Sequence, residues 1–380
     1  MKRSKNGSVL RVAIAGQGRS GYGIHANVLR RETKLFRIVA VADMLSERRE
    51  EAERELGVKA YPDWQDMLQA GGFDLFVNAL PTPLHVPATV AALKAGYHVI
   101  CEKPMAPTVK QFDRMVATAR RARRLLLPFQ NNRLQPFFFK MQDVIRSGVL
   151  GDIVHVRSSW GGFSRRWDWQ TFQCNLGGTL MNTGPHAIDQ ALQLFGEREE
   201  PRVFCKLECR NELGGDADDF CTLTLHGKQS PTVEVNLSAY QAYPQGEMYH
   251  VSGTRGGMTG GARQLVWRYY DVRKAPRQSI WPAWSEDRAY PRETLPWVEK
   301  QWSVDAATDA GCRSGYTLRS YACGVTLCYH NIHDALCKGK ELLVTPAQVR
   351  RQIAVIEASR RQNPLPVKWR KWVPGHGPVR

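Results

Sequence analysis

The first third of the chain alternates short apolar runs with helical stretches. The apolar runs are residues 9–15, 36–42, 75–80, 98–101 and 125–129, and the helical stretches between them include 47–56, 86–95 and 109–124. Runs that are apolar at nearly every position are typical of parallel strands buried on both faces. Their alternation with helices predicts a doubly wound parallel sheet with helices on both sides.

The pattern changes after about residue 130. Strand-like runs without intervening helices follow, at residues 153–160, 202–210, 220–226, 232–239 and 249–253. Consecutive strands predict a large, mainly antiparallel open sheet. Residues 273–310 combine Pro, Trp and charge and predict an irregular excursion, whereas 316–338 and 345–361 return to helical periodicity. We therefore predict an α/β protein with two domains, 1–130 and 131–380, the second of the α+β type.

Composition agrees with an ordinary globular protein. The 380 residues exceed what one hydrophobic core usually supports, and 43% are apolar and 23% charged. No run approaches the roughly 18 apolar residues of a membrane helix, and the N-terminus lacks a signal-like apolar region, so we predict a cytoplasmic protein without a membrane partner. The nine cysteines are scattered without the paired spacing of zinc sites, which predicts reduced thiols and no metal.

The formal net charge of +17 fits a nucleic-acid partner, an acidic substrate or a basic solvated surface. Residues 120–124 supply part of it at a predicted helix end, where cations complement the helix dipole. Residues 367–372 supply more and mix basic with aromatic side chains. Because no nucleic-acid-binding fold is recognisable, we predict no nucleic-acid partner.

A glycine motif follows the first apolar run directly and reads Gly16-Gln17-Gly18-Arg19-Ser20-Gly21. In this motif Gly16 permits a tight turn, Gly18 lets a pyrophosphate approach the backbone, and Gly21 allows close packing of helix on strand. The helix that follows adds positive potential at its N-terminus. The motif predicts a Rossmann dinucleotide-binding domain over residues 1–130.

Asp43 ends the second apolar run, where Rossmann domains hold the hydroxyls of the adenosine ribose. A carboxylate at this position repels a 2′-phosphate, so we predict NAD as the cofactor. Arg48 and Arg49 lie close in sequence and keep NADP possible.

Three further motifs are specific in combination and in order. They are Asn78-Ala79-Leu80-Pro81-Thr82-Pro83-Leu84-His85, Cys101-Glu102-Lys103-Pro104 and Gly177-Gly178-Thr179-Leu180-Met181-Asn182-Thr183-Gly184-Pro185-His186-Ala187-Ile188-Asp189. With the glycine motif, they make the chain resemble the Gfo/Idh/MocA family of glucose-fructose oxidoreductases and inositol dehydrogenases. The resemblance implies hydride transfer between a nicotinamide and a secondary alcohol or ketone of a sugar, cyclitol or related polyol. It also implies a homodimer or homotetramer joined through the second-domain sheet.

The resemblance extends the predicted cofactor site to the later strand ends. Beyond the glycine motif and Asp43, the predicted cofactor contacts are Arg48, Leu80, Pro81, Thr82, His85, Glu102, Lys103 and Gln130.

The resemblance also assigns the catalytic residues. It implies that Lys103 lies between the nicotinamide ribose and the substrate hydroxyl, where a desolvated lysine can relay a proton. His186 matches the histidine usually regarded as the general acid or base, and imidazole titrates near neutral pH. Asn182 stands where the family commonly has an aspartate, and an amide cannot accept a proton.

Two explanations of Asn182 stay open. Either His186 works with Lys103 alone, or Asp168 or Asp189 substitutes as the acidic partner. Asn182 and Thr183 could also simply cap the helix that begins near Pro185, and a capping side chain can still face the substrate.

Residues 161–171 are rich in planar and hydrogen-bonding side chains that suit sugar recognition. The predicted substrate contacts are Arg166, Trp167, Asp168, Trp169, Gln170, Asn182 and His186. Two other functions stay possible. One is a glycosidase that uses bound NAD for transient oxidation and elimination, and the other is a non-catalytic NAD and sugar sensor.

Overall fold

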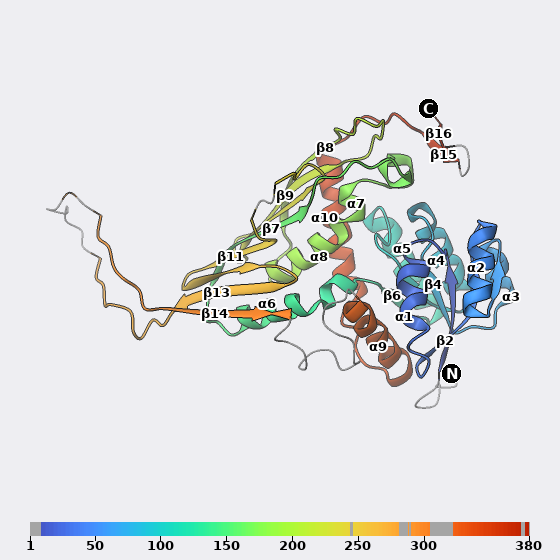
Figure 1. Cartoon of the computed structure of the whole chain (residues 1–380), viewed down its shortest axis with the longest axis horizontal. Coiled ribbons are helices and arrows are strands. Elements are labelled where there is room, and N and C mark those ends of the chain that lie inside the picture. Colours follow the sequence, from blue (N-terminus) through green and yellow to red (C-terminus); the bar gives the residue numbers. More distant parts are fainter. Residues whose placement is uncertain are drawn as a thin grey trace.

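The computed structural model describes residues 9–243, 246–280, 288, 290–304, 322–373 and 377–379. Two sheets organise these residues (Figure 1). One has six strands in the order β3-β2-β1-β4-β5-β6, and the other has eight in the order β14-β13-β12-β11-β7-β10-β9-β8. This architecture confirms the predicted α/β fold with a Rossmann sheet and a larger second sheet.

The first sheet is parallel throughout. Its strands are β1 (Leu10–Ala15), β2 (Phe36–Ala42), β3 (Lys59–Tyr61), β4 (Leu75–Asn78), β5 (His98–Cys101) and β6 (Leu126–Pro128). The helices between them are η1 (Gly21–Ala26), α1 (Asn27–Leu29), α2 (Ser46–Leu56), α3 (Trp64–Ala70), η2 (Thr82–Leu84), α4 (His85–Lys94) and α5 (Val109–Ala122). The strand order reverses between β1 and β4, where open parallel sheets bind their ligands.

The second sheet is antiparallel except where β7 and β10 pair in parallel. Its strands are β7 (Ile153–Gly161), β8 (Arg202–Glu208), β9 (Phe220–His226), β10 (Thr232–Ser238), β11 (Tyr249–Gly253), β12 (Gly256–Gly260), β13 (Gln264–Tyr270) and β14 (Trp297–Ser303). The remaining elements are η3 (Asn131–Leu134), α6 (Pro136–Arg146), η4 (Trp169–Thr171), η5 (Gln173–Asn175), α7 (Thr179–Asn182), α8 (Gly184–Phe195), α9 (Ala322–Lys338), α10 (Pro346–Gln362), β15 (Lys371–Val373) and β16 (Gly377–Val379).

The structure corrects two expectations about the second half. Helices are not absent there, because α6 and α8 precede and interrupt the strands. The predicted irregular excursion contains β14, which pairs with β13 from Tyr270 opposite Trp297 onward. Most of β14 is exposed at the sheet edge, so it lacks the apolar alternation of an internal strand. The first part of the helix expected over 316–338 lies outside the described residues.

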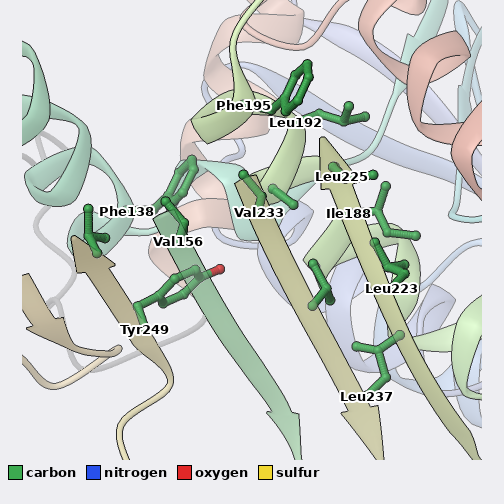
Figure 2. Packing of buried hydrophobic residues seen from close by; sticks show 14 of the residues in the cluster. Phe138, Val156, Ile188, Leu192, Phe195, Leu223, Leu225, Val233, Leu237 and Tyr249 are labelled. Carbon is green, nitrogen blue, oxygen red and sulfur yellow. The ribbon is translucent and has the colours of Figure 1, made fainter. Parts of the chain in front are cut away.

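One face of the second sheet is covered by α6, α8 and α10 (Figure 1). Ile188 and Leu192 of α8 pack against strand side chains such as Val233 and Leu223, and all four are at most 2% exposed (Figure 2). This packing fixes α8 on the sheet, so the start of α8 is held rigidly toward the first domain.

The last helices return to the first domain. Tyr329 of α9 is fully buried in the same core cluster as Phe36 of β2. Val349 and Ile353 of α10 share a core cluster with Phe112 of α5. The two halves are therefore joined by packing as well as by chain continuity, and a division at residue 130 stays a prediction.

The structure also bears on the cysteines, on metal sites and on membrane helices. Seven described cysteines form no disulfide, at positions 101, 174, 205, 209, 221, 328 and 337. Cys323 is disulfide-bonded, so the expectation of reduced thiols is wrong at that position. Within the described ranges, no group of three or more His, Cys, Asp or Glu side chains could hold a metal, and no helix is long and apolar enough to cross a membrane.

A buried ion pair between Arg133 and Asp189 links η3 to α8, and the two side chains are 6% and 2% exposed. Asp189→Ala leaves the guanidinium buried without a counter-charge, so we expect the free energy of unfolding to fall by about 3–5 kcal/mol. Asp143→Ala, which removes the exposed pair with Arg146, should cost under about 1 kcal/mol. Urea denaturation measures both, and equal losses would contradict the prediction.

Candidate active site

The glycine motif forms the turn at the carboxyl end of β1. Gly16 has a φ of +90°, and a Cβ there would lie 2.4 Å from the carbonyl oxygen of Ala79. A Cβ on Gly21 would lie 1.7 Å from the carbonyl oxygen of Gly16. Both positions therefore require glycine, because the loops after β1 and β4 and the following helix approach closely. Gly18 differs, since the nearest atom to its Cβ position is the Arg48 guanidinium at 3.6 Å.

Asp43 lies against this turn at the end of β2. One carboxylate oxygen accepts the Gln17 N–H at 2.7 Å and lies 3.5 Å from an Arg48 guanidinium nitrogen. The other accepts the Leu45 N–H at 3.0 Å. The carboxylate is thus oriented by backbone donors, with a cation beside it.

The loop after β4 carries Leu80, the exposed Pro81 and the buried Thr82. His85, at the start of α4, is 2% exposed, and its ring nitrogens lie 2.8 Å from the carbonyl oxygens of Leu80 and Pro104. Burial lowers the pKa of His85, so the ring is neutral and its one N–H can donate to only one of these two oxygens. The predicted cofactor contact of His85 stays a prediction.

The residues present fit a dinucleotide. The side-chain oxygens of Gln17 and Gln130 are buried and have no hydrogen-bond partner, and both residues lie at carboxyl ends of sheet strands. Buried polar atoms are normally satisfied, so such orphans indicate a bound group that completes them. The open side of Gly18 leaves room for a pyrophosphate beside Arg19 and Ser20.

A buried network lies beneath Lys103. His25 of η1 is fully buried, with its Nδ1 2.7 Å from the Tyr329 hydroxyl and its Nε2 3.2 Å from a Glu102 oxygen. Burial alone would raise the pKa of Glu102, but the hydrogen bond and charge of His25, with the charge of Lys103, lower it to about 2. The other Glu102 oxygen accepts the backbone N–H of Lys103 at 3.0 Å. Glu102 is therefore an ionised anchor, not an exposed ligand.

Lys103 reaches across to the second domain. Its Nζ donates to the backbone oxygen of Asn182 at 2.9 Å and to the side-chain amide oxygen at 3.2 Å. Burial lowers the pKa of Lys103, and the carboxylate of Glu102 opposes that shift. The guanidinium charges of Arg19 and Arg166 reinforce it. The amine therefore loses its proton more readily than an ordinary lysine.

His186 is 9% exposed in α8, and its Nδ1 is buried without a hydrogen-bond partner. Burial, reinforced by the charge of Lys103, lowers the pKa of His186 to about 3. The imidazole is therefore neutral at pH 7, and His186 does not titrate near neutrality as expected from an ordinary imidazole. The unpartnered nitrogen suits a hydrogen bond with a ligand.

Neither proposed acidic partner serves His186. Asp189 is paired with Arg133, and Asp168 accepts two hydrogen bonds from Arg166 at 2.8 and 2.9 Å. No hydrogen bond described in the structure joins either carboxylate to the imidazole. Of the charged side chains around His186, Lys103 has the largest effect on its pKa, followed by Glu102 and Arg19.

The short helix α7 is anchored by Asp218. A carboxylate oxygen of Asp218 accepts the Leu180 N–H at 2.7 Å, and its backbone oxygen accepts the Thr179 N–H at 2.7 Å. Burial raises the pKa of Asp218 to about 6. Asn182 ends α7, and Thr183 occupies the N-cap position of α8 but makes no side-chain capping bond, so the alternative in which these two side chains cap the helix is not supported.

A cavity of about 740 Å³ opens beside α7. Of the predicted substrate contacts, those that line it are Arg166, Gln170 and Asn182. Trp167 is 78% exposed and does not line it, and neither does Trp169, whose carbonyl oxygen accepts from Asn175. Within the loop, Arg166, Asp168 and Gln170 bond to one another, which gives this part of the wall a defined shape.

Sequence reasoning missed His25, Tyr329 and Asp218. His25 follows Gly21 by one helical turn, so it could have been found as a polar residue on a buried helix face. Tyr329 contacts it across 304 residues, and Asp218 reaches α7 across 38. No local sequence pattern predicts contacts between residues so far apart in the chain.

Two family models match the chain. Residues 10–129 match the oxidoreductase family with an NAD-binding Rossmann fold, and residues 138–259 match the GFO/IDH/MocA C-terminal domain. A crystal structure of an NAD-binding protein from Listeria innocua superposes with a TM-score of 0.74 over 95% of this chain and 100% of that one, at 21% identity. That likeness concerns the fold.

Curated relatives include dehydrogenases. The D-glucoside 3-dehydrogenase of Escherichia coli is 32% identical over 52% of this chain and 57% of its own length. The myo-inositol 2-dehydrogenase of Thermotoga maritima is 27% identical over 65% of this chain and 74% of its own. The chain matches 60% of the length of another relative, an oxidoreductase of Schizosaccharomyces pombe.

Glu102 holds the pKa of Lys103 up, so Glu102→Gln should lower it further. We expect the limb of the pH profile of kcat/KM that reports the lysine to move to lower pH. Glu299→Gln, on the exposed edge strand, should leave the profile in place. A profile that keeps its midpoint while the rate falls uniformly would exclude an electrostatic link.

Proposed function

The chain belongs to the Gfo/Idh/MocA oxidoreductase family, and we propose that it transfers a hydride between a nicotinamide and a secondary alcohol or ketone of a sugar, cyclitol or polyol. The observation that carries this proposal is the amine of Lys103, which has a lowered pKa and meets Asn182 at the junction of the two domains. It lies at the carboxyl end of β5 in an NAD-binding Rossmann sheet, where such sheets bind ligands.

The strand ends would hold the dinucleotide. Gly18 would face the pyrophosphate and Asp43 the adenosine ribose. The side-chain oxygen of Gln130, which has no partner in the protein, would accept a hydrogen bond from the bound dinucleotide. When bound, the nicotinamide supplies hydride acceptance and donation. The protein must then orient the alcohol and move one proton.

Lys103 is the residue we assign to that proton. Asn182 offers two acceptor oxygens, which take two N–H groups of the amine. In the neutral amine, the lone pair is then left to accept the proton of a substrate hydroxyl as it becomes a ketone. In the ammonium, the third N–H is left to return that proton to a ketone oxygen.

Neutral His186 would orient the same hydroxyl. Its unpartnered Nδ1 can donate or accept according to the tautomer, so it can bind either the alcohol or the ketone. Because its pKa is about 3, we assign it a hydrogen-bonding role and leave the net proton transfer to Lys103.

Lys103→Ala removes the proton acceptor but leaves the glycine turn and Asp43 in place. We expect turnover to fall by about 10²–10⁴ while NAD binding changes little. Turnover is measured on a panel of polyols, uronates and glycosides with NAD, following both NADH and product. NADH accumulation identifies a dehydrogenase, turnover without net NADH a glycosidase, and NAD binding without turnover a sensor. Unchanged turnover in Lys103→Ala would remove this residue from the mechanism.

Asp43→Ser removes the charge that opposes a 2′-phosphate, while Arg48 stays beside the site. We expect the ratio of kcat/KM for NADP to that for NAD to rise at least tenfold. Adding Arg48→Ala should cancel most of this gain. A ratio that is unchanged in Asp43→Ser would mean that the ribose lies elsewhere.

A further inference from the structure

The cavity beside α7 offers more room than the reacting part of a substrate needs. Its volume is about 740 Å³. Cavities of about 300–1,000 Å³ enclose drug-sized ligands, which are larger than one sugar ring. Lys103 and His186 are not among its lining residues, whereas Asn182, which bonds to Lys103, is, so a ring that reacts at Lys103 would occupy at most one end of the cavity. The cavity is therefore space for another part of the substrate.

The cavity begins where the proposed chemistry takes place. Asn182 lines it and at the same time accepts hydrogen bonds from the Lys103 amine. Arg166 lines it as well, and its charge is close enough to perturb the Lys103 pKa. A substrate held at Lys103 therefore has the cavity mouth directly beside it.

The lining carries as many positive as negative side chains. The charged residues that line it are Arg165, Arg166, Arg210, Glu212, Asp218 and Asp219. Arg166 is already paired with Asp168 at 2.8 Å, and Arg210 with Glu208 at 2.6 Å. An anion at Arg166 or Arg210 would have to compete with these pairs. Arg165 makes no ion pair among the described residues, but three carboxylates share the same lining, so the balanced charge favours an uncharged, hydroxyl-bearing group over an anion.

Two exposed aromatic rings also line the cavity. Phe163 is 63% exposed and Tyr240 is 42% exposed, and the two residues are joined by a β-bridge. The Tyr240 hydroxyl donates to Asp219 at 2.5 Å, which fixes that side chain. Flat, exposed rings held in this way can stack on the apolar face of a sugar or on an aromatic group.

We propose that this cavity is a second substrate subsite, which binds the uncharged substituent of a glycoside while the substituted sugar ring reacts at Lys103. Phe163 and Tyr240 stack on the substituent, and Gln170 and Asn182 bond to its polar groups. This inference rests on the proposed oxidoreductase function and narrows its substrate class.

The test compares free sugars with matched glycosides under saturating NAD. For each of several hexoses, we measure kcat and KM for the free sugar, its disaccharide and its phenyl glycoside. We expect KM to be about tenfold lower for the two glycosides, with kcat nearly unchanged, because stacking adds binding without altering the reacting carbon.

Phe163→Ala should remove most of this advantage and leave the free sugar unaffected. The matched control is Phe204→Ala on β8, since Phe204 is equally exposed at 64% but does not line the cavity. It should leave all substrates unaffected. Equal KM values for free and substituted sugars, a preference for uronates or sugar phosphates, or equal effects of Phe163→Ala on every substrate would overturn the subsite.

Failure of the function itself would look different. If no member of the panel is oxidised, calorimetry with the disaccharide and the NAD-loaded protein still tests the cavity. Binding that Phe163→Ala weakens supports the subsite without the chemistry, and no binding overturns it.

Discussion

The ionised carboxylate of Glu102 is the interaction on which the rest of the site depends. A buried charge costs several kcal/mol unless it is paired and hydrogen-bonded. His25 supplies that partner from the helix after the glycine turn, and Tyr329 of α9 fixes the other side of the same imidazole. The carboxylate then holds the backbone of Lys103. The helix after the glycine turn, the end of β5 and α9 therefore meet around one buried charge, which is why packing far along the chain matters to the amine of Lys103.

The parts of this arrangement that follow local rules could be predicted from the sequence. β2 and β5 of the parallel sheet are mostly apolar runs, and β9 and β11 of the second sheet bury alternate side chains. All four strands have the bounds expected from the sequence. The turn at Gly16 needs a positive φ, so a glycine is required there and its place in the sequence predicts the turn. Elements and roles that depend on distant partners were missed. The edge strand β14 pairs on one side only, and Asp218 acquires its raised pKa from burial beside α7, neither of which local composition encodes.

The role of the basic and aromatic segment at residues 367–372 also could not be predicted from its composition. Its composition is that of a binding surface, yet the Trp369 indole donates to the carbonyl oxygen of Gly214 at 2.8 Å and packs edge-on against Phe172. Asp216 accepts the N–H groups of Lys368 and Trp369 at 2.9 and 3.2 Å. These contacts brace the loops that enclose the cavity, so the segment stabilises a wall of the proposed substrate site.

In the mechanism proposed above, the amide at position 182 limits how the proton can leave. A carboxylate at this position would raise the pKa of Lys103, and each unit of that shift would cost about 1.4 kcal/mol in forming the neutral amine. Asn182 orients the amine without this penalty, but an amide cannot take the proton onward. His186, with its pKa near 3, does not hold it at neutral pH either. Lys103 is only partly buried, so we propose that the proton it accepts passes to solvent. The loss of a carboxylate relay is therefore compatible with catalysis as long as water keeps access to this amine.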